Sequence, residues 1–316
     1  MFNFLLYEPM HQAGVDVLNA IGNVRMASAT DEDTIVAEIG DIDGVVIRGN
    51  GRMSRRIMEH APRLKVVGRH GVGVDNLDLD AATDHSIQVV NTPEATVEPV
   101  AEHAVAFMLA LSKMLLPCDR MARSDRFAER LGVQGVEMQG KTLGVVGFGR
   151  IGQRVAQICR LGLNMQILYS DVVAWPEVER SLGAQRLDLH DLLPLADYVT
   201  VHVPLLPSTR KMMGAREFAL MKPSAYFVNT SRGPVVDEEA LVKILKARRI
   251  AGAGIDVYEK EPAPGDHPFF SLDNIVVSPH VASSTAEALV EMSLVAKDVA
   301  AVLQGRPAKF PVNTLR

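Results

Sequence analysis

The chain has 316 residues and a mass of 34.4 kDa, and since a domain takes roughly 150 residues, we expect about two domains. Hydrophobic residues make up 47% and charged residues 22%, which is ordinary for a globular protein and excludes disorder along the whole chain. A net charge of −5 and an aromatic content of 5% argue against a nucleic-acid-binding protein, which would neutralise phosphates and stack on bases.

The cysteines and the hydropathy pattern indicate the cellular setting. Cys118 and Cys159 have no CxxC partner and no histidine cluster nearby, so we expect two free thiols. The apolar N-terminus is short and lacks a basic lead, which predicts a first strand and no signal peptide. No apolar run reaches about 18 residues, so we expect a cytoplasmic protein without a membrane partner.

In the first hundred residues, short runs rich in Val and Ile alternate with amphipathic segments. This alternation is typical of βαβ units that build a parallel sheet covered on both faces. It predicts five strands and one small doubly wound sheet, the strands lying at Phe4–Tyr7, Val24–Ala27, Gly44–Ile47, Lys65–Gly68 and Ile87–Val90.

A turn at Asn91-Thr92-Pro93 precedes a long helix that we expect over Val97–Leu116, ending at Pro117. The alternation then restarts and predicts a second doubly wound sheet of about six strands, at Thr142–Val146, Gln166–Tyr169, Tyr198–His202, Ala225–Asn229, Gly252–Ile255 and Ile275–Val277. A last helix is expected over Thr285–Leu303, and the tail Phe310–Val312 is expected to return to the first sheet. The predicted fold class is α/β, with two doubly wound parallel-sheet domains.

The strongest local motif is a GxGxxG pattern that follows an apolar strand and opens a helix. Gly147 allows the tight turn, Gly149 lets backbone N–H groups approach a pyrophosphate, and Gly152 lets the helix pack closely on the strand. Asp171 ends the next strand about 20 residues on, where its carboxylate can accept hydrogen bonds from the adenosine ribose. Because Val172-Val173 brings no cation for a 2′-phosphate, we expect NAD in preference to NADP; a bare strand–helix turn is the alternative.

Three late segments carry candidate chemistry at strand ends, where open α/β sheets bind ligands. Arg232 follows one strand, Asp256 and Glu261 follow the next, and His280 follows the last. Each has an ordinary alternative: a solvated loop arginine, surface acids in an acidic loop, and a structural histidine. Together they supply what hydride transfer to a 2-oxo acid needs, since Arg232 can bind the carboxylate, His280 can donate a proton and Glu261 can orient that histidine.

Competing chemistry has little support in the sequence. The nine histidines show no HxxxH or HExxH spacing, so we predict no metal site. No GxSxG motif is present, which disfavours a serine hydrolase.

The segments GFGRIG, NTSRG, GIDVYEKEP and SPHVASST resemble the D-isomer-specific 2-hydroxyacid dehydrogenase family along essentially the whole chain. The segments GRHGVGVDN and VAEH are most similar to its phosphoglycerate dehydrogenase and hydroxypyruvate reductase branch. The resemblance implies a Rossmann NAD-binding domain, residues 98–284, inserted in a flavodoxin-like substrate domain of residues 1–97 and 285–316. It also implies a cleft between the domains and a homodimer formed mainly through the nucleotide domain.

The same resemblance implies roles for individual residues. Arg232 would clamp the substrate carboxylate, His280 would be the proton donor and Glu261 its partner. The cofactor would be bound by a further set of residues, namely Arg150 and Ile151 at the pyrophosphate, Asp171 at the ribose, Thr230, Ser231 and Asp256 near the nicotinamide end, and Val203.

The identity of the substrate is left open by the first domain. Arg48 and Arg69 follow its third and fourth strands, where they could hold a second anionic group such as phosphate, sulfonate or carboxylate; surface arginines are the alternative, more so for Arg52. We also assign His70, Gly71 and Val72 to the substrate site. The branch often has Asn where this chain has Thr96, and Glu98 adds an acid that disfavours phosphate.

These observations predict an NAD-dependent dehydrogenase for a D-2-hydroxy acid or its 2-oxo form, with 3-phosphoglycerate, glycerate or hydroxypyruvate, or a similar small anion as substrate. An NADH-sensing, corepressor-like binding protein of the same fold is the alternative from another class. Within the enzymes, oxidation of formate or phosphite is a further alternative.

Overall fold

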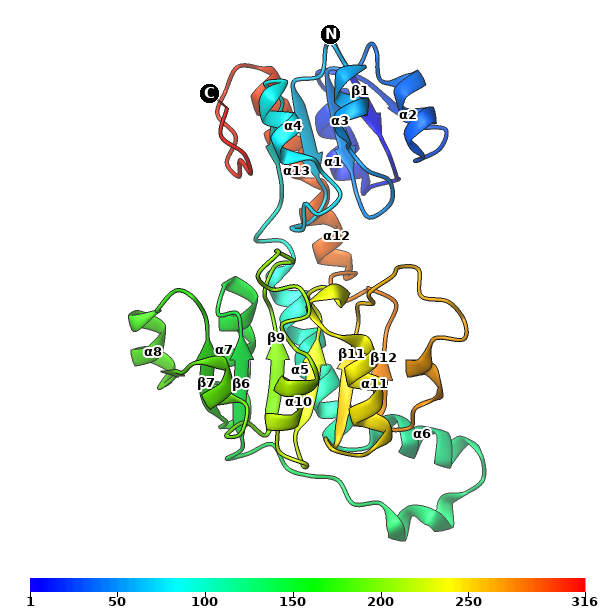
Figure 1. Cartoon of the computed structure of the whole chain (residues 1–316). Coiled ribbons are helices and arrows are strands. Elements are labelled where there is room, and N and C mark those ends of the chain that lie inside the picture. The colour runs from blue at the N-terminus through cyan, green and yellow to red at the C-terminus, as the bar shows by residue number, and fades with distance from the viewer. Residues whose placement is uncertain (316) are drawn as a thin grey trace. The chain divides into compact units, whose positions relative to one another are not determined.

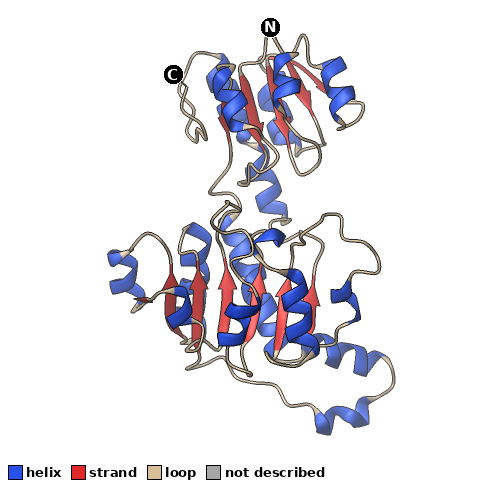
Figure 2. Ribbon diagram, viewed as in Figure 1, coloured by secondary structure: helices blue, strands red, loops and turns tan. Residues whose placement is uncertain are grey.

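The computed structural model describes residues 1–315 and separates into two compact units (Figure 1). One unit combines Met1–Thr96 with the chain from Ser284 onward, and the other is Val97–Ser283. The division expected from the sequence lies one residue from each of these points. In both units a parallel sheet is covered by helices, as Figure 2 shows.

The first unit has five parallel strands in the order β2-β1-β3-β4-β5, the flavodoxin-like order. They are β1 (Phe2–Leu6), β2 (Gly22–Met26), β3 (Gly44–Ile47), β4 (Val66–Arg69) and β5 (Gln88–Val90). One face packs on α2 (Glu32–Glu38), α3 (Arg55–Glu59) and α4 (Leu79–Asp84), the other on α1 (Gln12–Asn19) and α13 (Val295–Leu303). Pro311 bridges to Val90, which confirms that the tail returns to this sheet.

The second unit has seven parallel strands in the order β12-β11-β10-β9-β6-β7-β8, a Rossmann arrangement. They are β6 (Thr142–Val146), β7 (Gln166–Ser170), β8 (Gln185–Arg186), β9 (Tyr198–Val201), β10 (Tyr226–Asn229), β11 (Gly252–Ile255) and β12 (Ile275–Val277). The strand missed by the sequence analysis is β8, because two exposed residues carry no hydrophobic pattern. The predicted fold class is confirmed.

Helices cover both faces of this sheet because neighbouring strand residues point to opposite sides. Val145 packs into the core under α5 (Val97–Ser112), α7 (Arg150–Leu163) and α8 (Pro176–Leu182). Val146 packs into the core under α9 (Leu189–Leu192), α10 (Ala215–Leu220) and α11 (Glu238–Lys246). Three 3-10 turns complete the unit, at Phe127–Gly132, Gly233–Val235 and Pro268–Ser271.

Two long helices expected from the sequence are each broken in the structure. The first ends at Ser112, Met114 takes a left-handed conformation with φ 50°, and α6 (Leu115–Arg123) begins. Pro117 therefore lies in the first turn of a helix where it was expected to end one, because a first-turn residue needs no N–H. The last helix is divided at Leu294 into α12 (Ala286–Ser293) and α13, where the Ser293 hydroxyl donates to the Val290 carbonyl and competes with the helix ladder.

Among the described residues, no single helix has the length and hydropathy to cross a membrane. Within residues 1–315, α5 and α6 meet those two criteria when taken together, as a pair bent by 61°.

Candidate active site

Three neighbouring strands of the second unit end in loops that carry the predicted chemical groups. Arg232 follows β10, Glu261 follows β11 and His280 follows β12. These strands are adjacent and parallel, and Asn229 pairs with Ile255, which pairs with Val277. Their carboxyl ends therefore lie along one edge of the sheet, where open α/β folds bind ligands.

His280 and Glu261 form the closest pair in this group. The distance between His280 Nδ1 and Glu261 Oε2 is 2.6 Å, and the side chains are 45% and 35% exposed. Since Nδ1 faces the carboxylate, Nε2 is the ring nitrogen that can face a substrate. Burial raises the pKa of Glu261, but hydrogen bonds from His280 and the Tyr258 N–H, with the charges of His280 and Arg232, outweigh it and lower the pKa below its ordinary 4.5. Glu261 is thereby held as a carboxylate.

The Arg232 loop is shaped by a buried asparagine. Asn229 is 1% exposed; its amide donates to the Arg232 carbonyl (2.9 Å), and its side-chain oxygen accepts from the N–H and the hydroxyl of Ser231. Next to it, a Cβ at Gly233 would lie 1.9 Å from the Tyr258 carbonyl. Only glycine permits this approach, so the loop bearing Arg232 lies directly against the loop bearing Glu261.

His280 itself has a left-handed backbone, with φ 53°, which costs a non-glycine residue about 1 kcal/mol. The conformation is held by Asp256, which is fully buried. The Asp256 carbonyl accepts the His280 N–H (2.7 Å), and its carboxylate accepts the N–H groups of Val281 (2.9 Å) and Ala282 (3.0 Å). Asp256 thus binds the backbone of the loop that carries His280. Its contact with the nicotinamide end of the cofactor remains a prediction.

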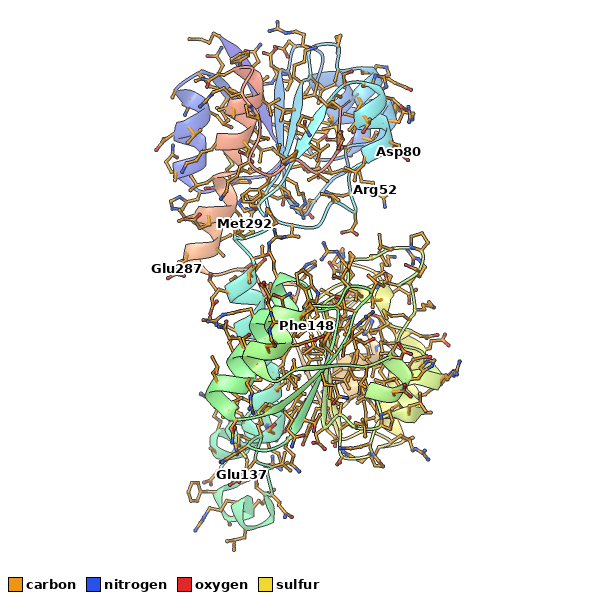
Figure 3. The ribbon with its side chains drawn as sticks, turned by 90° about the vertical axis from the view of Figure 1, so that its left-hand side faces the viewer. Arg52, Asp80, Glu137, Phe148, Glu287 and Met292 are labelled. Carbon is orange, nitrogen blue, oxygen red and sulfur yellow. The ribbon has the colours of Figure 1, made fainter. Side chains whose placement is uncertain are left out.

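The glycine motif forms the loop between β6 and α7, in which Figure 3 marks Phe148. Gly147 has φ 89°, and a Cβ there would lie 2.8 Å from the His202 backbone and from Val203. At Gly149, by contrast, an added Cβ would meet nothing within 4 Å. The loop is therefore closed towards the protein and open at the N-terminus of α7, where Arg150 and Ile151 begin the helix, and it fits a pyrophosphate.

The histidine that packs under this loop is neutral, and the helix lies close to the loop. Burial lowers the pKa of His202 to about 3, so its ring carries no charge at neutral pH. Gly152 lies so close to the loop that a Cβ would be 2.2 Å from the Gly147 carbonyl. The backbone of the loop thus presents the positive end of the α7 dipole to an anion.

Asp171 stands at the end of β7 and contacts the glycine loop. One carboxylate oxygen accepts the Phe148 N–H (2.5 Å) and the other the Val173 N–H (2.8 Å). Arg186, on the strand β8 that the sequence analysis missed, donates to the carbonyl oxygen of Asp171 (2.8 Å). A cation therefore lies beside Asp171 although none follows it in sequence. The carboxylate orders the loop, and its bond to a ribose remains a prediction.

Thr230 and Ser231 differ in how their hydroxyls are used. Ser231 donates to Asn229, whereas the Thr230 hydroxyl oxygen is buried and has no hydrogen-bond partner in the part of the chain that the structure describes. A buried polar atom without a partner is costly, so Thr230 fits a ligand that supplies the missing bond.

In the first unit, the loop after β4 is held by its own groups. Arg69 donates to the carbonyls of Gly73 and His70 (both 2.6 Å), and Gly71, with φ 124°, exchanges bonds with Thr92. Arg48, after β3, donates to the Pro9 carbonyl (2.5 Å). Arg69 thus shapes the loop that contains Gly71 and Val72. Its predicted contact with an anion would be made in addition to its bonds to the two carbonyls.

His70 is the distinctive member of this loop. It is 4% exposed, and its Nε2 has no hydrogen-bond partner among the described residues. Burial first, and then the charges of Arg48 and Arg69, lower the pKa of His70 to about 4. His70 is therefore a neutral ring with one unused nitrogen, as a residue that contacts a substrate would be. Arg52, in contrast, is exposed at the surface of the unit (Figure 3).

The sequence analysis missed the residues that support the three loops. Asn229 could have been noticed as a polar residue that closes an otherwise apolar strand. Tyr258, whose N–H binds Glu261 and whose hydroxyl binds the Ser278 carbonyl, has no local pattern that marks it.

Comparisons with known proteins identify the family to which the chain belongs. The family model described as D-isomer specific 2-hydroxyacid dehydrogenase, NAD binding domain, matches residues 105–282. A glyoxylate reductase of Thermococcus litoralis is 39% identical over 292 residues, which cover 90% of this chain and 88% of that protein. A solved holo structure of D-mandelate dehydrogenase from Rhodotorula graminis has a TM-score of 0.91 and 28% identity, covering 100% of this chain and 98% of that one.

A D-3-phosphoglycerate dehydrogenase of Methanocaldococcus jannaschii is 38% identical over 315 residues, 99% of this chain. The match covers 60% of that relative, and this chain spans 56–60% of the length of three phosphoglycerate dehydrogenases that it resembles.

Proposed function

The chain belongs to the D-isomer specific 2-hydroxyacid dehydrogenase family, and on that premise we propose that it interconverts a small D-2-hydroxy acid and its 2-oxo acid with NAD(H). The observation that carries the proposal is the 2.6 Å contact between His280 and Glu261. The loop that bears Glu261 also packs against Gly233, which follows Arg232 directly in the chain. A cation, a proton donor and an orienting carboxylate are the groups that this reaction needs.

In the proposed reaction, the residues of the chain bind the substrate and move one proton. NAD(H), when bound, supplies or accepts the hydride. Arg232 binds the substrate carboxylate through its planar guanidinium and polarises the neighbouring carbonyl. His280 Nε2 donates a proton to the oxygen of that carbonyl as it gains charge. Glu261 holds the ring by Nδ1, so that Nε2 is oriented towards the substrate when it donates its proton.

We propose a small anionic substrate of the hydroxypyruvate, glyoxylate or 3-phosphohydroxypyruvate type. Among the relatives, the glyoxylate reductases and the phosphoglycerate dehydrogenases are named for different members of this class. Arg48 and the unpartnered Nε2 of His70 support a substrate with a further polar or anionic group beyond its carboxylate.

The test is NADH oxidation against hydroxypyruvate, glyoxylate, pyruvate, oxaloacetate, 3-phosphohydroxypyruvate and 3-sulfopyruvate. We expect turnover with at least one of them. Arg232→Ala should lower kcat/KM about 10²- to 10³-fold, as for removal of a charge-stabilising donor, while the Kd for NADH stays nearly unchanged. Arg248→Ala, which removes a surface arginine paired with Asp273, is the control. NADH binding without turnover of any acid would favour the corepressor-like alternative.

We further propose that the enzyme prefers NADH to NADPH, because the Asp171 carboxylate would repel a 2′-phosphate. The positive charge of Arg186 opposes this preference, because it would attract a 2′-phosphate. Its guanidinium donates to the carbonyl oxygen of Asp171 and so lies near that carboxylate. Comparing kcat/KM for the two cofactors decides the matter, and a higher value with NADPH would contradict the proposal.

A homodimer formed through the nucleotide unit also remains a proposal. The segment from α6 to Val136 has large apolar side chains in water, with Leu131 89% and Phe127 64% exposed. A second copy of the chain would cover them. Light scattering should give twice the chain mass, and the double variant Phe127→Asp/Leu131→Asp should give the single mass.

Both cysteines are free thiols, as expected, and a cytoplasmic location is still a prediction.

A further inference from the structure

A chain of hydrogen bonds runs from helix α5 to the loop that carries His280, entirely within the second unit. His103 Nε2 lies 3.0 Å from the Ser278 hydroxyl, although the two residues are 175 positions apart. The Ser278 hydroxyl donates to the Asp256 carboxylate, whose side chain is 1% exposed. His103 thus contacts Ser278, which in turn binds the carboxylate that supports the His280 loop.

The direction of these bonds follows from the number of protons. The Ser278 hydroxyl has one hydrogen, which it gives to the carboxylate, so it can only accept from His103. His103 must therefore carry its proton on Nε2. The same Nε2 is 3.9 Å from Asp256 Oδ1, so the N–H also faces the buried negative charge. The ring is fixed from behind by Phe107, edge to face at 4.6 Å between centroids.

Asp256 in turn receives three successive N–H groups, those of His280, Val281 and Ala282. These bonds hold His280 in its left-handed conformation, which is strained for a residue other than glycine. The Ser278 hydroxyl and the Val281 N–H both donate to Oδ1 of Asp256, so the orientation of the serine hydroxyl affects the same carboxylate that fixes the loop.

We infer that His103 is a positioning residue for the proton donor His280, acting through Ser278 and Asp256. The inference rests on the proposed function. Packing of α5 does not require a histidine here, because an apolar side chain would fill the place beside Phe107. What only a donor can do is fix the Ser278 hydroxyl on Asp256, and a displacement of a reacting group by about 1 Å is enough to slow chemistry severely.

Turnover provides the first test. In His103→Leu, kcat expressed per NADH-binding site should fall about tenfold, as loss of one positioning hydrogen bond would cause. KM and the affinity for NADH should be nearly unchanged. His103→Gln restores an N–H donor and should recover most of kcat. The double variant His103→Leu/Ser278→Ala should be no slower than Ser278→Ala alone, because both changes break the same chain. His190→Leu, which removes a surface histidine paired with Glu217, should leave kcat unchanged.

Amide hydrogen exchange provides a readout that does not depend on turnover. Exchange at Val281 and Ala282 should be about tenfold faster in His103→Leu than in the wild type, and should return towards the wild-type rate in His103→Gln. Equal kcat in the Leu and Gln variants, additive effects in the double variant, or unchanged exchange would overturn the inference. Absence of wild-type turnover would instead defeat the proposed function, and the exchange rates would then decide this inference alone.

Discussion

Two of the histidine–glutamate pairs in the second unit contact Tyr258, and their surroundings differ. In the pair formed by His280 and Glu261, the side chains are 45% and 35% exposed and 2.6 Å apart. In the pair formed by His267 and Glu238, they are 9% and 15% exposed and 3.3 Å apart. Tyr258 contacts both pairs: its N–H donates to Glu261, and its ring centroid lies 5.4 Å from that of His267.

The use of each ring nitrogen separates the two pairs. His267 Nε2 faces Glu238 and its Nδ1 accepts the Phe269 N–H, so both nitrogens are engaged inside the protein. The other oxygen of Glu238 accepts the Glu259 N–H (2.6 Å). His280 has Nδ1 on Glu261 and Nε2 left for a substrate. The same two residue types therefore support a loop in one place and offer a proton in the other.

The largest effect expected from breaking this comparison is in His280→Ala. Loss of a general acid should lower turnover about 10²- to 10⁴-fold. The matched change, His267→Ala, should alter kcat far less and should instead lower the free energy of unfolding. Steady-state NADH oxidation and urea unfolding measure the two. Similar kcat values for both variants would show that the exposed pair has no special role.

Glu261→Gln should have the next largest effect, lowering kcat/KM about 100-fold. The amide keeps the shape but no longer stabilises the charged ring of His280. The effect should be measured across pH with the substrate that turns over best. Activity within a few-fold of the wild type would remove Glu261 from the mechanism.

The same carboxylate makes a pH dependence predictable. Because its pKa lies below the ordinary 4.5 in the folded chain, its contribution to stability is complete above pH 4.5 and is lost as pH falls through the lowered value. Wild-type stability should therefore fall more steeply than that of Glu261→Gln below pH 4.5. Parallel curves from thermal unfolding between pH 3 and pH 6 would contradict this.

Glu238→Gln tests the buried pair directly. It removes one charge but keeps an acceptor for Glu259, so we expect a loss of about 1–2 kcal/mol in the free energy of unfolding. Because the Glu261 loop is supported from this side, KM should rise slightly while the acid limb of the pH profile stays in place. A shifted acid limb would mean that the buried pair takes part in proton transfer.

The smallest expected effect concerns the backbone of His280. At φ 53° alanine is strained and glycine is not, so His280→Gly should be more stable than His280→Ala by about 1 kcal/mol, with both equally inactive. Equal midpoints in urea would indicate that the loop relaxes when the ring is removed.

Much of the molecule could be predicted from the order of its residues. The alternation of apolar runs and amphipathic segments gives eleven of the strands, because a strand buried on both faces must be apolar throughout. Helix ends were harder to predict. The breaks at Met114 and Leu294 depend on Ser112 and Ser293, whose hydroxyls bond back to their own helices.

The sequence by itself determined the two parallel sheets, the glycine turn at Gly147, and the placement of Arg232, Glu261 and His280 at successive strand ends. All of these follow from local spacing and from periodicity along the chain. Only the tertiary structure decided which groups hold those residues in place, including Asp256 under the His280 loop and His103 behind Ser278. The physical reason is distance in sequence: a hydrogen bond between residues 175 positions apart leaves no pattern in either segment and forms only when the fold brings them together.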